Sequence, residues 1–146
     1  MKLLLAVDAS ECSQEAVKQV TAHFNPRSTL VKVLYVLSPA TYSTPPQMAR
    51  GYAPEMEELL KEVPFNVEHL AEKLRTAGFV VEAGVEIGEV RSTIIDCAAN
   101  WGADLIVIGS HGHKGLVRLL LGSVAESVVR HAACSVLVVR QSPSKP

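Results

Sequence analysis

The chain has 146 residues, a length that fits one domain and buries roughly 68–70% of its unfolded surface. Its formal net charge of −1 argues against a nonspecific nucleic-acid binder, and no apolar run approaches the roughly 18 residues of a membrane helix. Three widely spaced cysteines without a CxxC pair, Cys12, Cys97 and Cys134, predict reduced thiols in a cytoplasmic protein.

The first part of the chain alternates short apolar runs with amphipathic segments. Residues 3–7 form a continuous apolar run, which is typical of a buried parallel strand. Ser10 is the expected N-cap of a helix over 11–24, and residues 30–37 are the second expected strand. The connection over 38–54 contains four prolines. A connection of this length is usually a lid, a partner-contacting loop or disordered.

The alternation continues to the end of the chain. Apolar residues at helical spacing predict a helix over 56–74, with Gly78 as its C′ residue. The remaining expected elements are a strand at 79–87, a helix at 90–99, a strand at 105–108, a helix at 123–132 and a strand at 135–139. Residues 1–141 are expected to form a single domain, followed by a flexible tail at 142–146.

Alternating strands and helices predict an α/β fold, in which one doubly wound five-stranded parallel sheet carries helices on both faces. If the strand order is 3-2-1-4-5, the winding reverses between the first and the fourth strand. Ligands of such sheets bind beyond the carboxyl ends of the strands at that point. Asp8 ends the first strand there, and Gly109 ends the fourth.

A glycine-spaced loop separates the fourth strand from the fourth helix: Gly109-Ser110-His111-Gly112, nine residues, then Gly122-Ser123. A strand, a glycine loop and a helix N-terminus together present backbone N–H groups to an anion. The glycines permit positive φ and close approach of a ligand, and Ser123 with Glu126 predicts a capping box. The alternative is that these glycines only make tight turns. The spacing is neither a Walker A loop nor GxGxxG.

The composite motif resembles the ATP-binding signature of the universal stress protein family. Residues 103–109, 119–126 and 135–139 are similar to the family as well, as is the opening Leu5-Ala6-Val7-Asp8-Ala9-Ser10. The resemblance covers nearly the whole chain. It implies an adenine nucleotide alpha hydrolase-like fold, and it implies ATP or another adenine nucleotide as the ligand.

The resemblance also implies a role for each site residue. Asp8 and Ala6 would flank the adenosine, and Val36 would offer backbone hydrogen bonds to the adenine. The ribose and the phosphates would lie along a further set: Ile108, Gly109, His111, Gly112, Gly122, Ser123 and Val124. Some members carry a hydroxyl residue where this chain has Ala125, so one phosphate contact is expected to be missing. A Gly122→Val change is expected to abolish ATP binding and leave the protein folded.

The sequence offers few groups for metal binding or catalysis. Asp8 is expected to hold Mg²⁺ only together with the phosphates, and the alternative for Asp8 is an Asx-type turn into the first helix. His111 and His113 have no nearby third metal ligand. Glu126 is a candidate base only if it is not committed to capping, so at most slow ATP hydrolysis is expected.

The expected function is that of an ATP-binding universal stress protein, a nucleotide-responsive regulator read by a downstream partner that the sequence does not identify. Two alternatives are an enzyme, as a slow ATPase or nucleotidyl-transfer relative, and a nucleotide-free interaction module. The apolar last strand, Ser135–Val139, is expected to be a sheet edge and to form a homodimer. The alternative for this edge is cover by the 38–54 connection.

Overall fold

The computed structural model describes residues 1–38, 49–111 and 120–141, with the backbone alone at 49–57, 59 and 60. The chain runs in the order β1 (Lys2–Val7), α1 (Glu11–His23), β2 (Leu30–Leu37), α2 (Ala49–Thr76), β3 (Val80–Ile87), α3 (Val90–Trp101), β4 (Leu105–Gly109), α4 (Ser123–His131) and β5 (Ser135–Val139). The five strands form one sheet in the order β3-β2-β1-β4-β5, and every neighbouring pair is parallel. The predicted fold class and strand order are confirmed.

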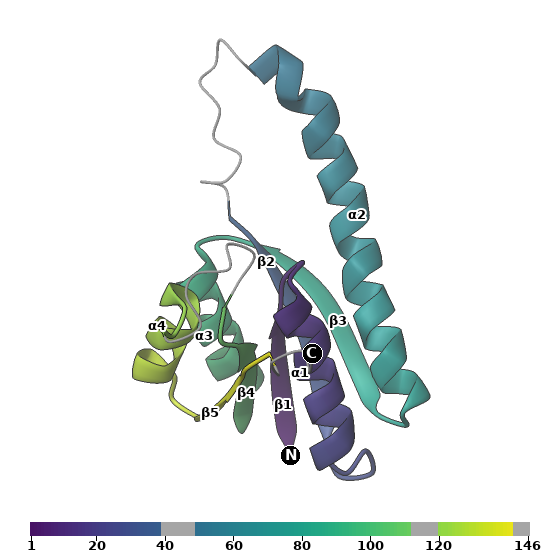
Figure 1. Cartoon of the computed structure of the whole chain (residues 1–146), viewed down its shortest axis with the longest axis vertical. Coiled ribbons are helices and arrows are strands. Elements are labelled where there is room, and N and C mark those ends of the chain that lie inside the picture. Colours follow the sequence, from purple (N-terminus) through teal and green to yellow (C-terminus); the bar gives the residue numbers. More distant parts are fainter. Residues whose placement is uncertain (39–48, 112–119, 142–146) are drawn as a thin grey trace, which may run out of the picture.

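Both faces of this sheet are covered, which explains why its strands are continuously apolar. Along β1, Leu3, Leu5 and Val7 pack in one cluster with apolar residues of α1 and α2. Leu4 and Ala6 pack in the other cluster, with residues of α3 and α4. Successive side chains of a strand point to opposite faces, so an uninterrupted apolar run supplies both cores. Figure 1 shows α1 and α2 on one side of the sheet and α3 and α4 on the other.

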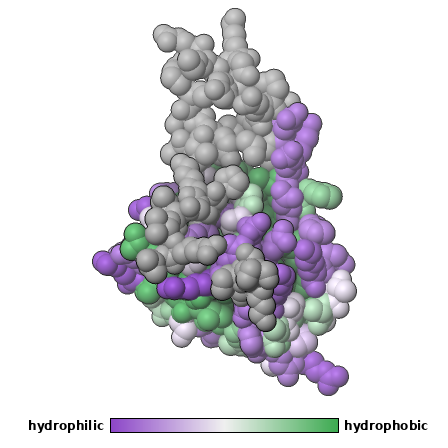
Figure 2. Space-filling model, viewed as in Figure 1, coloured by the Kyte–Doolittle hydropathy of each residue, from purple (hydrophilic) through white to green (hydrophobic). Residues whose placement is uncertain are grey.

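Helix α2 begins earlier than the sequence predicted. It starts at Ala49, so residues 49–54 of the expected connection are helical, and the helix continues through Pro64 to Thr76. Residues 39–48, the rest of that connection, lie outside the described residues. At a rise of 1.5 Å per residue the helix is about 42 Å long, and it extends well past the sheet (Figure 1). Figure 2 shows that the exposed side of its described part is hydrophilic.

Two glycines end helices in the left-handed region that favours glycine. Gly78 follows α2 with φ 97°, as the sequence predicted for a C′ residue, and Gly102 is the C-cap of α3 with φ 73°. Within the described ranges, no helix is both long enough and apolar enough to span a membrane. The predicted tail at 142–146 lies outside those ranges.

Candidate functional site

The carboxyl ends of β1 and β4 meet where the winding of the sheet reverses. Their last pair is Ala6 with Ile108. Beyond that pair, β1 leads through Asp8 to α1 on one face of the sheet, while β4 leads through Gly109 toward α4 on the other. The structure therefore brings Ala6, Asp8, Ile108 and Gly109 to one edge of the sheet, as the sequence predicted. Doubly wound sheets bind their ligands at this edge.

The carboxylate of Asp8 is held by two serines at the start of α1. Its Oδ1 accepts hydrogen bonds from the Ser10 N–H at 2.8 Å, from the Ser13 hydroxyl at 2.9 Å and from the Ser10 hydroxyl. The Ser13 hydroxyl in turn accepts the Asp8 N–H at 2.7 Å. The bond from Ser10 N–H is the Asx turn that the sequence offered as the alternative for Asp8. All three bonds that the Asp8 carboxylate accepts from described residues fall on Oδ1, so Oδ2 accepts no hydrogen bond from a described residue.

Ser10 occupies the predicted N-cap position, but its hydroxyl makes no capping bond. It donates to Asp8 instead. The start of α1 thus fixes the orientation of a half-buried carboxylate. Because the two serine hydroxyls both bond to Oδ1, the arrangement is compatible with a ligand contact from Oδ2.

Val36 lies on β2 one residue beyond the last β1–β2 pair, Val7 with Tyr35. The Gly88 N–H donates to the Leu37 carbonyl at 2.9 Å, so the polar backbone groups of Leu37 face β3. Successive residues of a strand direct these groups to opposite neighbours. Those of Val36 therefore face the β1 side, where β1 has already turned away. The Val36 carbonyl therefore faces the side on which Asp8 follows β1.

Gly109 and Gly122 serve close packing within the protein. A Cβ on Gly109 would lie 2.7 Å from the Cβ of Cys12, and a Cβ on Gly122 would lie 2.8 Å from the Ser110 carbonyl oxygen. Neither glycine has positive φ, so that part of the prediction is wrong for these two positions. A Gly122→Val side chain would collide with the Ser110 carbonyl, and the expectation that this variant leaves the fold intact is not supported. Gly112 lies outside the described residues.

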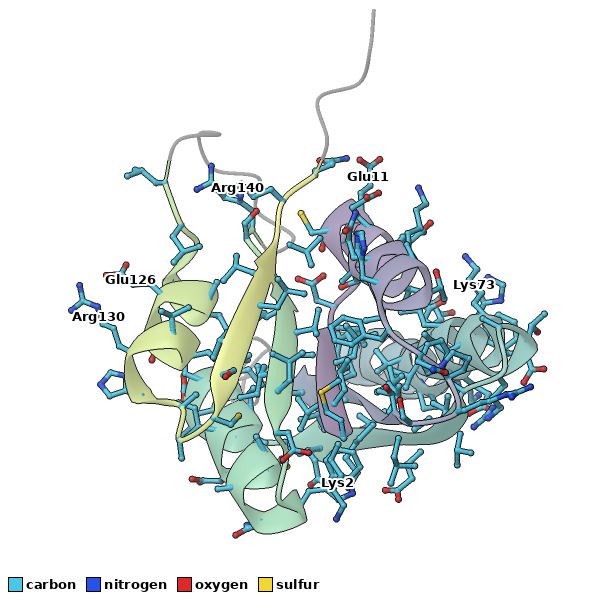
Figure 3. The ribbon with its side chains drawn as sticks, turned by 90° about the horizontal axis from the view of Figure 1, so that it is seen from below. Lys2, Glu11, Lys73, Glu126, Arg130 and Arg140 are labelled. Atoms are coloured by element: carbon cyan, nitrogen blue, oxygen red, sulfur yellow. The ribbon has the colours of Figure 1, made fainter. Side chains whose placement is uncertain are left out.

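The predicted capping box at Ser123 does not form. The N-cap of α4 is Gly122, which has no side chain, and Ser123 is the exposed first residue of the helix. Glu126 does not reach back to the N-cap; its Oε1 lies 2.9 Å from Nη2 of Arg130 (Figure 3). The first intrahelical bond runs from Glu126 N–H to the Gly122 carbonyl at 2.9 Å.

The first turn of α4 contains backbone donors that no described side chain caps. The N–H groups of Ser123, Val124 and Ala125 precede the first intrahelical bond, and no side chain within the described ranges caps them. The N-terminus of a helix carries a partial positive charge as well. The loss of the predicted cap therefore makes this helix end a better anion site than the sequence implied.

Ser110 is a site residue that the sequence pattern did not reveal. It is 2% exposed, its N–H donates to the Val139 carbonyl at 2.8 Å, and its carbonyl accepts the Gly122 N–H at 2.7 Å. Its hydroxyl lies 3.0 Å from Nδ1 of His111. The residue thus joins the ends of β4 and β5 to the N-cap of α4. Its place between Gly109 and His111 was the available signal, but a serine in a glycine loop does not reveal burial.

His111 carries a buried polar atom that makes no hydrogen bond with the described part of the chain. Its Nε2 is buried and has no hydrogen-bond partner among the described residues. An unpaired buried polar group costs about 1–3 kcal/mol, so it is an informative exception. It lies in the residue that follows Ser110, next to the uncapped helix end.

Two further residues at the start of α4, Val124 and Ala125, lie against the core. Ala125 is 2% exposed and packs with the α3–α4 core, and the half-buried Val124 lies against the same cluster. The side chain at 125 therefore faces the protein interior. His113 lies outside the described residues. Within the described part of the chain, no three His, Cys, Asp or Glu side chains form a metal site.

Taken together, the donors and acceptors at this edge fit a phosphorylated nucleoside. Uncapped N–H groups and the orphaned imidazole nitrogen suit phosphate oxygens. The oriented Asp8 carboxylate suits ribose hydroxyls, or a Mg²⁺ ion that takes its other ligands from phosphate and water. The Val36 carbonyl suits an amino group of a base.

Comparison with known proteins gives one consistent family. The Universal stress protein family matches residues 1–140. The chain is 32% identical to universal stress protein Sll1388 of Synechocystis sp., over 95% of this chain and 97% of that protein. It is 33% identical to universal stress protein MJ0531 of Methanocaldococcus jannaschii, over 96% and 82% respectively.

Solved structures agree with this assignment. The structure of MJ0577, a protein of M. jannaschii, superposes with a TM-score of 0.87 at 29% identity and covers 98% of this chain and 97% of that one. Three more distant family structures share the fold and were solved with a nucleotide. An Arabidopsis thaliana protein with AMP has a TM-score of 0.72 at 20% identity, covering 99% of this chain and 97% of that one. An Archaeoglobus fulgidus protein with dAMP has a TM-score of 0.69 at 23% identity, covering 95% and 97%. A protein with cAMP has a TM-score of 0.67 at 22% identity, covering 97% and 98%.

Proposed function

The chain belongs to the universal stress protein family, and we propose that it binds an adenine nucleotide, with ATP as the leading candidate. The site is the carboxyl edge of the sheet between β1 and β4. The nucleotide acts as a regulatory ligand, and its occupancy changes what a partner protein recognises in a stress response. The free state of all three cysteines supports our further proposal of a reducing, cytoplasmic setting.

The observation that carries the proposal is the uncapped N-terminus of α4. Its N-cap glycine is hydrogen-bonded to Ser110 at the end of β4. Three successive N–H groups without a partner among the described residues are a binding arrangement for phosphate, because each donates toward the same anion and the helix dipole favours negative charge. Distant members of the family bind AMP, dAMP and cAMP, which supports adenine as the base.

In this proposal each part of the nucleotide meets a different element. The base lies against Ala6 and the Val36 backbone, and the ribose lies near Asp8. The phosphates lie along Ile108, Gly109 and the loop through His111 and Gly112, and they reach the helix end. At that end they meet the backbone of Gly122, Ser123 and Val124.

The proposal is for binding, with Mg²⁺ held through Asp8 where the bound nucleotide carries it. Glu126, the candidate base considered from sequence, is exposed and paired with Arg130 on the outer side of α4. A carboxylate with this partner is poorly placed to activate a nucleophile. We therefore assign no catalytic residue.

The direct test is to identify and titrate the ligand. Mass spectrometry of small molecules released from the purified, heat-denatured protein should detect an adenine nucleotide. Calorimetric titration with ATP, ADP, AMP and adenosine should then rank them. Asp8→Asn is expected to weaken ATP binding at least tenfold, whereas Asp96→Asn, the same charge change on an exposed face of α3, should leave it unchanged. No retained nucleotide and no binding at millimolar ATP would reject the proposal.

We also propose that β5 forms a homodimer through its outer edge. β5 is an edge strand, Leu137 is 37% exposed, and hydrophobic side chains gather over this part of the surface in Figure 2. The Ser110 N–H bonds to the Val139 carbonyl, so by alternation the Val138 N–H faces outward, toward a partner strand.

A proline substitution tests this interface without breaking the β4–β5 ladder. Val138→Pro removes an outward N–H and is expected to give a monomer in size-exclusion chromatography with light scattering. Ala83→Pro makes the same change at an outward position of the opposite edge strand, β3, and should leave the dimer intact. A monomeric parent protein, or a dimeric Val138→Pro variant, would contradict the proposal.

A further inference from the structure

We propose that Ser110 is a positioning residue for the nucleotide. Its hydroxyl donates to Nδ1 of His111, holds the imidazole in the tautomer that carries its proton on Nε2, and thereby presents a neutral N–H donor to a phosphate oxygen. The inference rests on the proposed function, and it assigns a role to a residue that the family motif leaves as an ordinary loop position.

Ser110 is itself buried and held in place by two backbone hydrogen bonds. It is 2% exposed, and its two backbone groups bond to Val139 at 2.8 Å and Gly122 at 2.7 Å. A side chain anchored in this way points in one direction, and its hydroxyl lies 3.0 Å from Nδ1 of His111. The rigid end of the sheet therefore fixes the imidazole that follows it.

The direction of the Ser110–His111 bond follows from the fate of the buried hydroxyl hydrogen. If Nδ1–H donated to the hydroxyl oxygen, the hydroxyl hydrogen would have no acceptor among the described residues, because the imidazole is its partner there. In that tautomer the Nε2 lone pair would be unpaired as well, so two buried polar groups would lack partners among the described residues. If the hydroxyl donates to Nδ1, only the Nε2 group lacks a partner. Nδ1 then has no proton, and the neutral ring carries its proton on Nε2.

The proton on Nε2 has no acceptor within the described part of the protein. Nε2 is buried and unpartnered, so the tautomer moves the unsatisfied donor from the serine to the imidazole. The backbone of His111 lies against the N-cap of α4, since a Cβ on Gly122 would be 3.5 Å from the His111 Cα. A phosphate at the uncapped helix end supplies the missing acceptor.

The expected effect is specific to phosphorylated ligands. A hydrogen bond to a charged acceptor contributes about 1.5–3 kcal/mol, which corresponds to roughly a 10- to 100-fold change in affinity. Ser110→Ala frees the ring to exchange tautomers and turn, so it should lose part of this factor for ATP and ADP. Adenosine has no phosphate, and its affinity should change less than about twofold.

Two measurements test the positioning role, and both use the full chain. In the parent protein without nucleotide, ¹⁵N NMR of the imidazole should show Nδ1 unprotonated and Nε2 protonated for His111. In Ser110→Ala the same spectrum should show mixed tautomers, a change that a merely structural role would not produce. Ser127→Ala on α4 is the matched control, because Ser127 accepts a hydrogen bond from the His131 ring through its backbone carbonyl, which the substitution keeps.

A double-mutant cycle then links the two residues to phosphate binding. His111→Ala should weaken ADP binding roughly 10- to 100-fold, and adding Ser110→Ala to it should cause no further loss, because the serine acts through the imidazole. His111→Gln, which keeps a neutral N–H donor, should recover part of the affinity. Urea unfolding of each variant measures any loss of stability separately.

The outcomes distinguish this inference from the proposed function. If the parent protein binds neither ADP nor ATP, both are wrong. If it binds them, but His111 carries its proton on Nδ1, the inference alone is wrong. The inference alone is also wrong if Ser110→Ala weakens adenosine and ADP equally, or if the two substitutions act additively. Should Ser110→Ala fail to fold, the spectrum of the parent and the His111 variants still decide.

Discussion

Gly109, the first glycine of the loop motif, packs closely against Cys12, and this contact allows the cost of a larger residue at position 109 to be predicted. In a Gly109→Ala variant the new Cβ would lie 2.7 Å from the Cβ of Cys12, while the next nearest atoms would be at ordinary distances of 3.6 and 3.7 Å. The collision therefore involves one methylene on the first turn of α1. Cys12 is buried, so neither partner has an easy escape.

The expected cost can be worked from this geometry. Overpacking a core by one methyl group costs about 1–3 kcal/mol. Replacing glycine by alanine at a compatible φ returns about 0.4–1 kcal/mol through the unfolded state. Gly109→Ala should therefore destabilise the protein by about 1–2 kcal/mol. Cys12→Gly removes the opposing Cβ, but it introduces glycine into a helix at about 1 kcal/mol and also loses buried apolar area.

The double variant, Cys12→Gly with Gly109→Ala, removes the Cβ and the sulfur at position 12 and places a Cβ on the other side of the contact. Because the collision disappears, the two changes together should cost about 1–3 kcal/mol less than their sum. Urea unfolding gives each free energy of unfolding, and an unchanged m-value confirms that midpoints compare stability. Gly84→Ala is the matched control, because a Cβ there has nothing within 4 Å.

Two results would refute this reasoning. One is a Gly109→Ala variant that is as stable as Gly84→Ala, and the other is a double variant without coupling between positions 12 and 109. Nucleotide titration of the double variant tests whether Gly109 is also needed for ligand binding, separately from its packing against Cys12. If the stability is recovered but ATP binding is lost, the ligand also needs the bare backbone at this position.

Two further predictions concern the helix ends. Ser123→Ala should change the free energy of unfolding by no more than about 0.5 kcal/mol in urea titration, whereas a serine acting as N-cap would lose about 1 kcal/mol. Glu89→Ala should cost about 1 kcal/mol near neutral pH, because the Glu89 side chain accepts the Ser92 N–H at 2.8 Å as the N-cap of α3. That bond lowers the pKa of Glu89 from its ordinary value of 4.5. The stabilisation that Glu89 gives to the folded state is therefore complete above pH 4.5 and is lost as the pH falls through the lowered pKa. Glu126→Ala, an exposed glutamate without a capping bond, should show neither the cost nor this pH dependence.

Much of the architecture was accessible from the sequence because it depends on local patterns. Apolar runs such as 3–7 and 105–108 are typical of strands covered on both faces, and Gly78 marks a helix end through its backbone freedom. The early start of α2 escaped prediction. One glycine, Gly51, and one proline, Pro54, weaken the local helix signal over 49–54, yet the backbone there is helical.

At the site, the sequence determined which residues arrive at the edge between β1 and β4. The strand ends placed Asp8 and Gly109, and the alternation of elements placed the point where the winding reverses. The sequence could not decide what each group does there, because a hydrogen bond goes to whichever partner the fold brings close. Ser123 looked like a cap, but the chain enters α4 one residue earlier, through Gly122.

Only the tertiary structure decided how the polar groups are divided between protein and ligand. Contacts between residues far apart in sequence commit the Ser110 and Gly122 N–H groups to the protein and place a Cys12 methylene against Gly109. The same packing leaves the first turn of α4 and Nε2 of His111 without partners in the described chain. Local sequence patterns indicate which segments form strands and helices. Long-range packing fixes which donors remain for a phosphate.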